Sequence, residues 1–492
     1  MHTRSLWQNT APSLPQFPVL DHDLQCEAAV VGAGMAGILT AWFLQQAGLD
    51  VVVLESRTPC AGVTAHTTAK ITSQHGLIYR DLIATLGKTR AGQYAQANQK
   101  AIQDYADLVD SLGIECDFRR ADSYVFDRTV DTALAAEVSA ANSLGIPAVL
   151  TRDTELPFQV AGAVKFPNQA CFHPLKFLSA LVPRLKIYAH TTARHIEGNT
   201  IHTDHAAVTA QHIVVATHFP FFLLPGLYFI RMHQERSYAV SLSKAAPMEG
   251  LYLDAQSSGY SFRSWQDQTI LTGAGHRTGR MPDQDSYEVL TQAAQRFWPE
   301  CEVTARWSTQ DCMPADRVPY IGAYSGAHQG LYVATGFQKW GMSSSMAAAR
   351  ILSDLILGRD NPNAGVFTPH RLPAPAGLGH LLTDGSISAA ALFSQAFYVP
   401  RAQLRQIGPG EGQVVTWNGK KVGAYRSEDN QFYLVSTRCP HMGCQLVWNR
   451  EEKTWDCPCH GSRFSYQGER LEAPASDDLQ CTLLSGQENE TQ

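Results

Sequence analysis

Two short segments rich in cysteine and histidine lie near the C-terminal end of this chain, CPHMGC at 439–444 and CPCHGS at 457–462. Their spacing is C-x-H, then fifteen residues, then C-x-x-H, and the candidate ligands are Cys439, His441, Cys457 and His460. Two thiolates and two imidazoles can hold a 2Fe-2S cluster, with both cysteines on one iron and both histidines on the other. The same four side chains also suit tetrahedral zinc. The pattern therefore predicts two loops folded around a metal centre.

A second cysteine in each segment bears on the choice between iron–sulfur and zinc. Cys444 and Cys459 lie one in each loop and could join the loops as a disulfide. This extra pair favours the 2Fe-2S cluster over zinc, and with it the transfer of single electrons. A c-type haem is excluded, because CPCH has one residue between its cysteines where haem attachment needs two.

The segment 400–492 resembles a Rieske domain of the respiratory, disulfide-containing kind. The resemblance implies that the two cysteines and two histidines named above bind the cluster. It also implies that Cys444 and Cys459 form a disulfide and that Ser462 donates a hydrogen bond to cluster sulfur.

The chain departs from this family at two places. Phe464 stands where the high-potential members carry a tyrosine. A lower reduction potential is expected, because hydrogen bonds to sulfur stabilise the reduced state and phenylalanine cannot donate one. Leu471 and Glu472 stand where glycine and proline are expected, at the start of the loop that carries Pro474 and covers the cluster. The conformation of that loop is therefore not predicted by the resemblance.

A second motif lies near the N-terminus. A buried strand is predicted at Ala28–Val31, followed by GAGMAG, an apolar helix through Leu44 and a second strand at Val51–Leu54. In this βαβ unit the glycines let a pyrophosphate approach the start of the helix, and an acid 23 residues after the first glycine holds the ribose hydroxyls. The predicted dinucleotide-binding residues are Gly32, Gly34, Gly37 and Glu55. FAD and NAD share this fingerprint.

A distant segment favours FAD. The sequence CMPADRVPYIG contains Asp316 and is followed by a predicted strand at Leu331–Ala334. A loop with a glycine at each end then leads into an apolar helix, whose N-terminus would suit the anionic edge of a flavin. The candidate flavin contacts here are Asp316, Gly336, Gly341 and Met342. Residues 26–365 resemble the D-amino acid oxidase and glycine oxidase superfamily. Together with the run HTTAKITSQHGLIY at 66–79 and the C-terminal segment, the chain resembles bacterial FAD-dependent oxidoreductases with a Rieske domain. The resemblance implies a flavin enzyme of the amine-oxidising type.

These segments predict the domain organisation. We expect an α/β, Rossmann-like FAD lobe, an α+β substrate lobe and a small all-β Rieske domain. The expected bounds are 1–25 for an N-terminal segment, 26–80, 150–235 and 310–360 for the FAD lobe, 80–150 and 235–310 for the substrate lobe, 366–399 for a linker with an apolar helix at Ile387–Phe397, and 400–492 for the Rieske domain.

Composition narrows the class of partner and compartment. The chain is 44% hydrophobic and 17% charged with a net charge of −6, and it has no basic block, so nucleic acid is not an expected partner. The first ten residues lack the apolar run of a signal peptide. No apolar run reaches the roughly 18 residues of a membrane helix. Eleven cysteines in 492 residues do not make a secreted disulfide scaffold, and the cytoplasm is the expected compartment.

No catalytic base stands out in the sequence. Arg263 is a candidate clamp for a substrate carboxylate, because arginine binds carboxylates through a bidentate fork. The other candidates for positioning or charge work are His276, Lys339, His218, Lys70 and His75. His66, with Thr67 beside it, lies in a loop that resembles the one where dimethylglycine and sarcosine dehydrogenases attach flavin through histidine. A non-covalent flavin contact is the favoured role for His66, and covalent attachment is the alternative.

The expected activity follows from combining both cofactors. A flavin enzyme would oxidise the C–N bond of an amine or amino-acid-like substrate, pass electrons to the Rieske cluster, and release them to an external carrier. Three alternatives remain open: reverse flow from a carrier to a bound substrate, an oxidase that uses oxygen directly, and an electron carrier or redox sensor. Rieske oxygenases are excluded, because only 32 residues follow His460 and none of them is a histidine that could bind a mononuclear iron.

Overall fold

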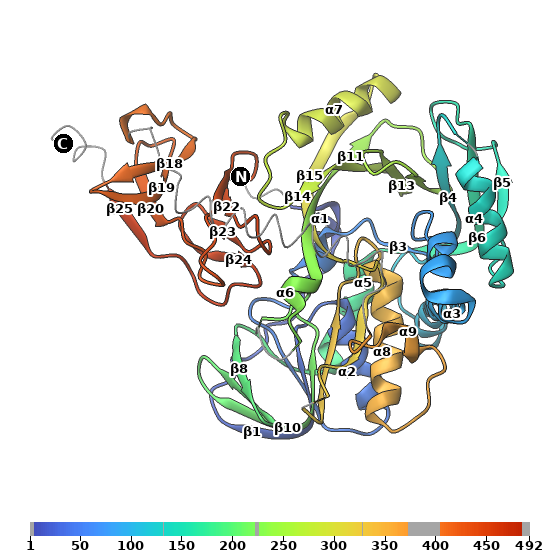
Figure 1. Cartoon of the computed structure of the whole chain (residues 1–492), viewed down its shortest axis with the longest axis horizontal. Helices are drawn as coiled ribbons and strands as arrows, with labels where there is room; N and C mark the ends of the chain where they lie inside the picture. The colour runs from blue at the N-terminus through green and yellow to red at the C-terminus, as the bar shows by residue number, and fades with distance from the viewer. Residues whose placement is uncertain (1–3, 131, 222–225, 327, 372–403, 485–492) are drawn as a thin grey trace.

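The computed structural model describes residues 4–130, 132–221, 226–326, 328–371 and 404–484. The chain forms an N-terminal domain up to residue 371 and a C-terminal domain from residue 404, and the two lie side by side (Figure 1). The apolar helix expected at Ile387–Phe397 lies outside the described residues.

The first sheet of the N-terminal domain is mostly parallel, with the order β16-β17-β10-β1-β2-β7 and the hairpin β8–β9 on β10. Its strands are β1 (Leu24–Val31), β2 (Val51–Leu54), β7 (Lys186–Tyr188), β8 (Ala193–Glu197), β9 (Thr200–Thr203), β10 (Ala207–Val215), β16 (Tyr320–Ala323) and β17 (Leu331–Thr335). The central strands are apolar on both faces, as expected for a parallel sheet covered by helices. Helices α2 (Met35–Gln46), α5 (Pro174–Leu181) and α8 (Gly341–Ile356) pack in this lobe.

The second sheet has nine strands in the order β15-β11-β14-β13-β12-β4-β6-β3, with β5 on β6. The strands are β3 (Lys70–Ile71), β4 (Arg119–Asp127), β5 (Val149–Thr151), β6 (Gly162–Cys171), β11 (Met232–Ser243), β12 (Leu251–Asp254), β13 (Ser261–Trp265), β14 (Gln268–Arg277) and β15 (Glu302–Pro314). The expected lobe boundaries shift here. The segment 150–235, assigned to the FAD lobe, supplies β5 and β6 to the second sheet, and β15 extends that sheet beyond residue 310.

The remaining helices of the N-terminal domain surround the two sheets. They are α1 (Leu6–Thr10), α3 (Tyr79–Leu112), α4 (Thr132–Ser143), α6 (Tyr228–Arg231), α7 (Ser286–Phe297) and α9 (Ala364–Phe367), with short 3-10 turns at Val63–His66 and Val182–Arg184. Gly87, with φ +80°, interrupts α3. The N-terminal segment is part of the fold, because Trp7 is fully buried and packs against Trp265 and His173. Within the part of the chain that the structure describes, no helix is long and apolar enough to span a membrane.

The C-terminal domain is a small all-β unit, which confirms the predicted fold class. It consists of two four-stranded antiparallel sheets, β18-β19-β20-β25 and β21-β22-β23-β24, after a 3-10 turn at Leu404–Gln406. Their strands are β18 (Gly412–Trp417), β19 (Lys420–Arg426), β20 (Phe432–Ser436), β21 (Val447–Asn449), β22 (Thr454–Asp456), β23 (Arg463–Ser465), β24 (Arg470–Glu472) and β25 (Cys481–Leu484). The two cysteine–histidine segments are the loops β20–β21 and β22–β23.

Candidate active site and cluster site

The glycine-rich loop between β1 and α2 has no room for a side chain at Gly32 or Gly37. A Cβ on Gly32 would lie 2.6 Å from the Ala216 carbonyl oxygen, and a Cβ on Gly37 would lie 1.9 Å from the Gly32 carbonyl oxygen. Gly32 also has φ +106°. The Glu55 carboxylate accepts a hydrogen bond from the Ala33 amide at 2.8 Å. The loop therefore keeps the start of α2 open and close to strand β2, as a bound pyrophosphate requires.

A cavity of about 1210 Å³ extends from this loop to the C-terminal domain. It exceeds the roughly 300–1,000 Å³ of a typical small-molecule pocket and can hold a dinucleotide together with a substrate. The predicted flavin-binding residues that line it are Gly32, Gly34, Glu55, His66, Thr67, Gly341 and Met342. Gly37 does not line the cavity and instead permits close packing of α2 on the glycine-rich loop.

Loop 60–68 is fixed by contacts from distant segments. The indole of Trp7 donates a hydrogen bond to the Thr67 carbonyl at 2.6 Å, and the indole of Trp307 donates one to the His66 carbonyl at 3.0 Å. His66 Nδ1 lies 2.9 Å from the Gly62 carbonyl oxygen. A carbonyl can only accept, so Nδ1 carries the proton, and burial lowers the pKa of the ring. His66 is therefore a neutral imidazole with an unprotonated Nε2.

Two predicted cofactor residues have structural roles instead. Asp316 does not line the cavity, and its carboxylate is bound by the Arg371 guanidinium at 2.6 and 2.9 Å. Gly336 also lies outside the cavity lining, and a Cβ there would lie 2.6 Å from Pro314 Cγ. The prediction that these two residues contact the flavin is not supported. They shape the segment that carries the cavity-lining residues at 337–342.

Arg263 is not placed to clamp a substrate carboxylate. Its guanidinium donates hydrogen bonds to the backbone carbonyls of Thr68, Ala69 and Phe172 and lies over the Trp7 ring. It is 1% exposed and does not line the cavity. Arg263 therefore holds the end of loop 60–68 in place, which corrects the expectation from its residue type.

The other catalytic candidates, His276, Lys339, His218, Lys70 and His75, all line the cavity. His276 is half-buried, desolvation lowers its pKa, and its Nε2 lies 3.0 Å from the Tyr238 hydroxyl. His218 Nε2 is buried and has no hydrogen-bond partner among the described residues. His75 is held by Tyr94 and Ser343 and stacks on Trp340, a set of contacts typical of a structural residue.

Lys70 is a buried amine on the cavity wall. Its Nζ donates hydrogen bonds to the Tyr252 carbonyl at 2.7 Å and to the Ser261 hydroxyl. Burial, reinforced by the nearby Arg263 guanidinium, lowers the pKa of Lys70 to about 7. A large share of this amine is therefore neutral at physiological pH.

Strands β11 and β15 bring together acidic and basic groups that the sequence does not reveal. Glu235 and Asp311 are cross-strand neighbours, and both line the cavity. Glu235 lies 3.2 Å from Lys339 Nζ and 3.4 Å from His233 Nε2. The hydrogen bond from His233 and the charge of Lys339 lower the pKa of Glu235 to about 2, against its burial. Asp311 is missed by sequence reasoning, because QDCMPAD carries no motif that marks it.

The C-terminal domain provides a complete ligand set for a 2Fe-2S cluster. The His441 and His460 rings lie 5.0 Å apart, and Nδ1 of each ring is buried with no hydrogen-bond partner among the described residues. Unpaired buried ring nitrogens are expected where a metal takes the lone pair. The Cys439 sulfur interacts with Cys457 and with Ser462, whose hydroxyl oxygen also accepts from the Ala475 amide at 2.9 Å. The four ligand side chains therefore fit the cluster.

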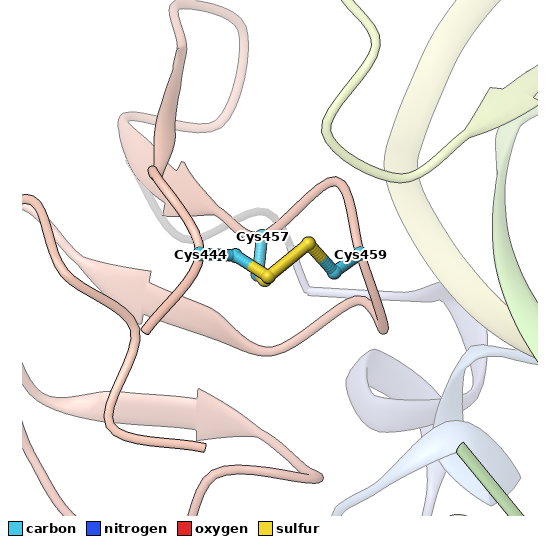
Figure 2. A group of neighbouring side chains, drawn as sticks. All are labelled: Cys444, Cys457 and Cys459. Carbon is cyan, nitrogen blue, oxygen red and sulfur yellow. A yellow bond between two sulfur atoms is a disulfide. The ribbon is translucent and has the colours of Figure 1, made fainter. Parts of the chain in front are cut away.

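The two ligand loops are joined by a disulfide. The Cys444 and Cys459 sulfurs lie 2.10 Å apart, and the bridge runs beside Cys457 (Figure 2). Phe464 is fully buried in the same apolar cluster as these cysteines. Its ring has no donor, so Ser462 is the side chain here that can donate a hydrogen bond to cluster sulfur.

The histidine-bearing loops dock against the N-terminal domain. The Phe229 ring lies edge-on to His441 and His460, with centroids 6.1 and 5.5 Å away. Gln234 Nε2 donates to the His460 carbonyl at 2.6 Å, and Gln310 Nε2 donates to the Gly461 carbonyl at 2.8 Å. Because Gln234 and Gln310 lie on β11 and β15, the cluster loops rest on the two strands that also line the cavity.

A buried ion network crosses the same interface. Arg236 of β11 is 1% exposed and binds Glu452, with one contact at 2.6 Å, and Glu472 at 3.4 Å. Arg463 binds the same two carboxylates and also Asp456 at 3.0 Å. The departure from the Rieske pattern at Leu471 and Glu472 thus has a structural consequence. Both residues line the cavity, and Glu472 anchors the covering loop to the N-terminal domain.

Comparison with known proteins agrees with this architecture. Residues 27–355 match the family model described as FAD dependent oxidoreductase, and residues 397–482 match the Rieske [2Fe-2S] domain model. A protein of Bacillus subtilis (strain 168) named as a Rieske 2Fe-2S iron-sulfur protein, YhfW, is 37% identical over 487 residues, which cover 96% of each chain. Gamma-glutamylputrescine oxidoreductase of Escherichia coli (strain K12) is 20% identical over 411 residues, 76% of this chain and 94% of that protein. The structure of glycine oxidase from Geobacillus kaustophilus superposes with a TM-score of 0.61 at 16% identity, over 71% of this chain and 99% of that chain.

Proposed function

Because the chain belongs to the FAD-dependent oxidoreductase family and carries a C-terminal Rieske 2Fe-2S domain, we propose that it is an amine or amino acid dehydrogenase with an internal electron relay. It oxidises the C–N bond of its substrate, and an external carrier finally collects the electrons. When bound, FAD takes two electrons from the substrate as a hydride equivalent, and the 2Fe-2S cluster carries electrons onward one at a time.

The substrate class rests on the related proteins and on the cavity. The names glycine oxidase and gamma-glutamylputrescine oxidoreductase both point to compounds with an amine nitrogen. The cavity supports such a ligand, because Glu235 and Asp311 place carboxylates on its wall. Its residues bind and orient the substrate.

The observation that carries the proposal is the docking of the ligand loops on β11 and β15. One cavity is lined by the glycine-rich loop, by these two strands and by Leu471 and Glu472 of the Rieske domain. The Phe229 ring contacts both histidine rings edge-on, and Gln234 donates a hydrogen bond to the backbone carbonyl of His460. This arrangement favours transfer within one chain over delivery of electrons from a separate flavoprotein.

The test is an anaerobic mixture of the holoenzyme with a panel of primary amines, N-methyl amines and amino acids. Flavin absorbance and the EPR signal of the reduced cluster are followed together. The proposal predicts that one compound bleaches the flavin and that the cluster signal then appears in the same molecule, at a rate independent of protein concentration.

A matched variant separates the two halves of the relay. In His460→Ala one of the four cluster ligands is missing, so the same compound should bleach the flavin while no Rieske signal develops. The proposal fails if no compound reduces the flavin while a reduced carrier fills first the cluster and then the flavin, because that order defines a reductase. Rapid reoxidation of the flavin when oxygen is admitted afterwards, with no cluster signal before it, would instead identify an oxidase.

A further inference from the structure

Asp311 is an unpaired carboxylate inside the cavity. It lies on β15, directly opposite Glu235 on β11, and is 6% exposed. Across the residues that the structure describes, no hydrogen bond or ion pair reaches its side chain, although it lines the cavity. Three other carboxylates of the cavity are held by cations: Glu235 by Lys339 and His233, and Glu452 and Glu472 by Arg236 and Arg463.

The charges around Asp311 are committed to other partners. Lys339 lies near it but pairs with Glu235, and Arg236 pairs with the two glutamates of the Rieske domain. Glu235 and Glu472 face it as like charges. Burial is the main cause that raises the pKa of Asp311 to about 7, opposed by the charge of Lys339. The side chain therefore changes its protonation state close to neutral pH.

A buried carboxylate without a partner is costly. A mostly buried polar group without a hydrogen-bond partner loses part of its hydration with nothing to replace it, and a charged group loses more. A ligand that brings a positive charge and N–H donors would remove this penalty. Groups of this kind, in a cavity and with a shifted pKa, are typical of catalytic acids and bases. A protonated amine has the matching charge and geometry.

We propose that Asp311 binds the ammonium group of the substrate and takes up its proton. This inference rests on the proposed function. In the step, an N–H bond of the ammonium breaks and an O–H bond forms on the carboxylate, so that an ammonium and a carboxylate become a neutral amine and a carboxylic acid. No electrons are transferred. The neutral amine then has the free lone pair on nitrogen that formation of a C=N bond requires, and FAD, when bound, would supply the oxidising chemistry.

The direction of the pH dependence follows from this role. In the free enzyme Asp311 is protonated below about pH 7 and ionised above it. Capture of an ammonium needs the ionised form, so affinity should rise from pH 6 to pH 8. Above that range the affinity should stay level until the amine itself loses its proton, near pH 10 for a simple alkylamine.

The first readout is binding without turnover. An amine that has no hydrogen on the carbon next to nitrogen cannot be oxidised, so its dissociation constant can be measured from the perturbation of the flavin spectrum. We expect Asp311→Asn to weaken this binding at pH 8 by about 100-fold and to abolish its rise between pH 6 and pH 8. Glu302→Gln, at the exposed end of the same strand, is the control and should behave as wild type.

The second readout is rescue by pH. The rate of anaerobic flavin reduction by an oxidisable amine should fall about 100-fold in Asp311→Asn at pH 7.5. That rate should then rise tenfold per pH unit, because the variant can use only amine already neutral in solution. Wild type and variant should converge near pH 10. A merely structural aspartate would give a defect of constant size at every pH.

Folding of the variant is checked by its FAD content and by the EPR signal of the dithionite-reduced cluster. If Asp311→Asn fails this check, Asp311→Ser takes its place in both readouts. The proposal is wrong if the folded variant binds the non-oxidisable amine with wild-type affinity and pH dependence. That result leaves the dehydrogenase proposal intact, whereas a wild-type enzyme that no amine can reduce overturns the dehydrogenase proposal itself.

Discussion

Arg236 offers the sharpest test of the docked arrangement, because it is the one residue of β11 seen to pair with two carboxylates of the Rieske domain. We consider its replacement by methionine, which keeps an unbranched apolar stem and removes the charge. Glu452 and Glu472 then share Arg463 alone. Breaking a buried ion pair by removing one partner costs about 3–5 kcal/mol, since the remaining charge stays buried without compensation.

The shifted pKa of Glu452 gives an independent magnitude. Its side chain is 11% exposed. Burial alone would raise the pKa, but Arg236 and Arg463 outweigh it and lower the pKa from 4.5 to about 2. At 1.36 kcal/mol per pKa unit, this shift corresponds to roughly 3 kcal/mol of stability. Because the pKa is lowered on folding, this contribution is complete above about pH 4.5 and is lost as the pH falls toward 2.

The assay for Arg236→Met combines stability and electron transfer. Denaturant unfolding of the holoprotein at pH 7, followed by flavin fluorescence and by the visible circular dichroism of the cluster, should show a loss of about 3–5 kcal/mol. The acid-induced loss of stability between pH 4.5 and pH 2 should be shallower than in wild type. Stopped-flow reduction of the cluster after substrate addition should slow, because a larger fraction of molecules is undocked.

Arg194 provides the matched control for Arg236→Met. It also reaches the Rieske domain, through the Ser476 carbonyl at 2.6 Å and Asp477 at 3.7 Å, but its side chain is 39% exposed. An exposed pair contributes about 0–1 kcal/mol, so Arg194→Met should change the measured stability by no more than this. If Arg236→Met leaves both unfolding and cluster reduction as in wild type, the docking does not depend on this network and our reasoning is refuted.

Three further predictions follow from single contacts. Gly37→Ala should abolish FAD retention on gel filtration, because the added Cβ would lie 1.9 Å from a backbone oxygen, and equal FAD content in variant and wild type would contradict this. Arg263→Met should lower the free energy of unfolding by about 1–3 kcal/mol, measured by thermal unfolding, because three backbone carbonyls lose their hydrogen-bond donor. In steady-state kinetics, its KM for a carboxylate substrate should change no more than its KM for an uncharged analogue. Phe464→Tyr should raise the midpoint potential of the cluster, because the added hydroxyl can donate a hydrogen bond to a ligand sulfur. A redox titration monitored by EPR measures this potential. An unchanged or lower potential would contradict the view that the missing hydrogen bond at position 464 lowers the potential of this cluster.

Sequence alone predicts those parts of the site whose chemistry is local. The ligands Cys439 and His441 lie one residue apart, and the glycine-rich loop acts through its own backbone and the strand that follows. The function of such a motif can be predicted from sequence, because the spacing of its residues fixes their local geometry. For the same reason the α/β and all-β character of the two domains is predicted from the sequence.

The errors concern residues whose partners come from elsewhere in the chain. Arg263 has the right chemistry for a carboxylate clamp, but its guanidinium is already hydrogen-bonded to the backbone carbonyls of Thr68 and Ala69. Asp316 has the right chemistry for a cofactor contact, but its carboxylate is already paired with Arg371. The role of Asp311 depends on the pairing of β15 with β11. No spacing rule connects these residues, since each contact spans tens of residues or more and exists only after the sheets assemble.

The interface also bears on whether the Rieske domain is docked or moves. Separating the domains would expose Arg236, Glu452 and Glu472 to water, which solvates charges well, so the intact ion network contributes less to docking than the cost of removing Arg236 alone suggests. The close backbone contacts are different. A Cβ on Gly461 would lie 2.7 Å from Gln234 Cβ, and a Cβ on Gly279 would lie 2.4 Å from Pro458 Cα. Pro458 lies between the ligand Cys457 and the disulfide partner Cys459, so these contacts hold the cluster loop itself. Packing at such distances, with two glutamines bound to loop carbonyls, favours a docked domain whose position relative to the cavity is fixed during electron transfer.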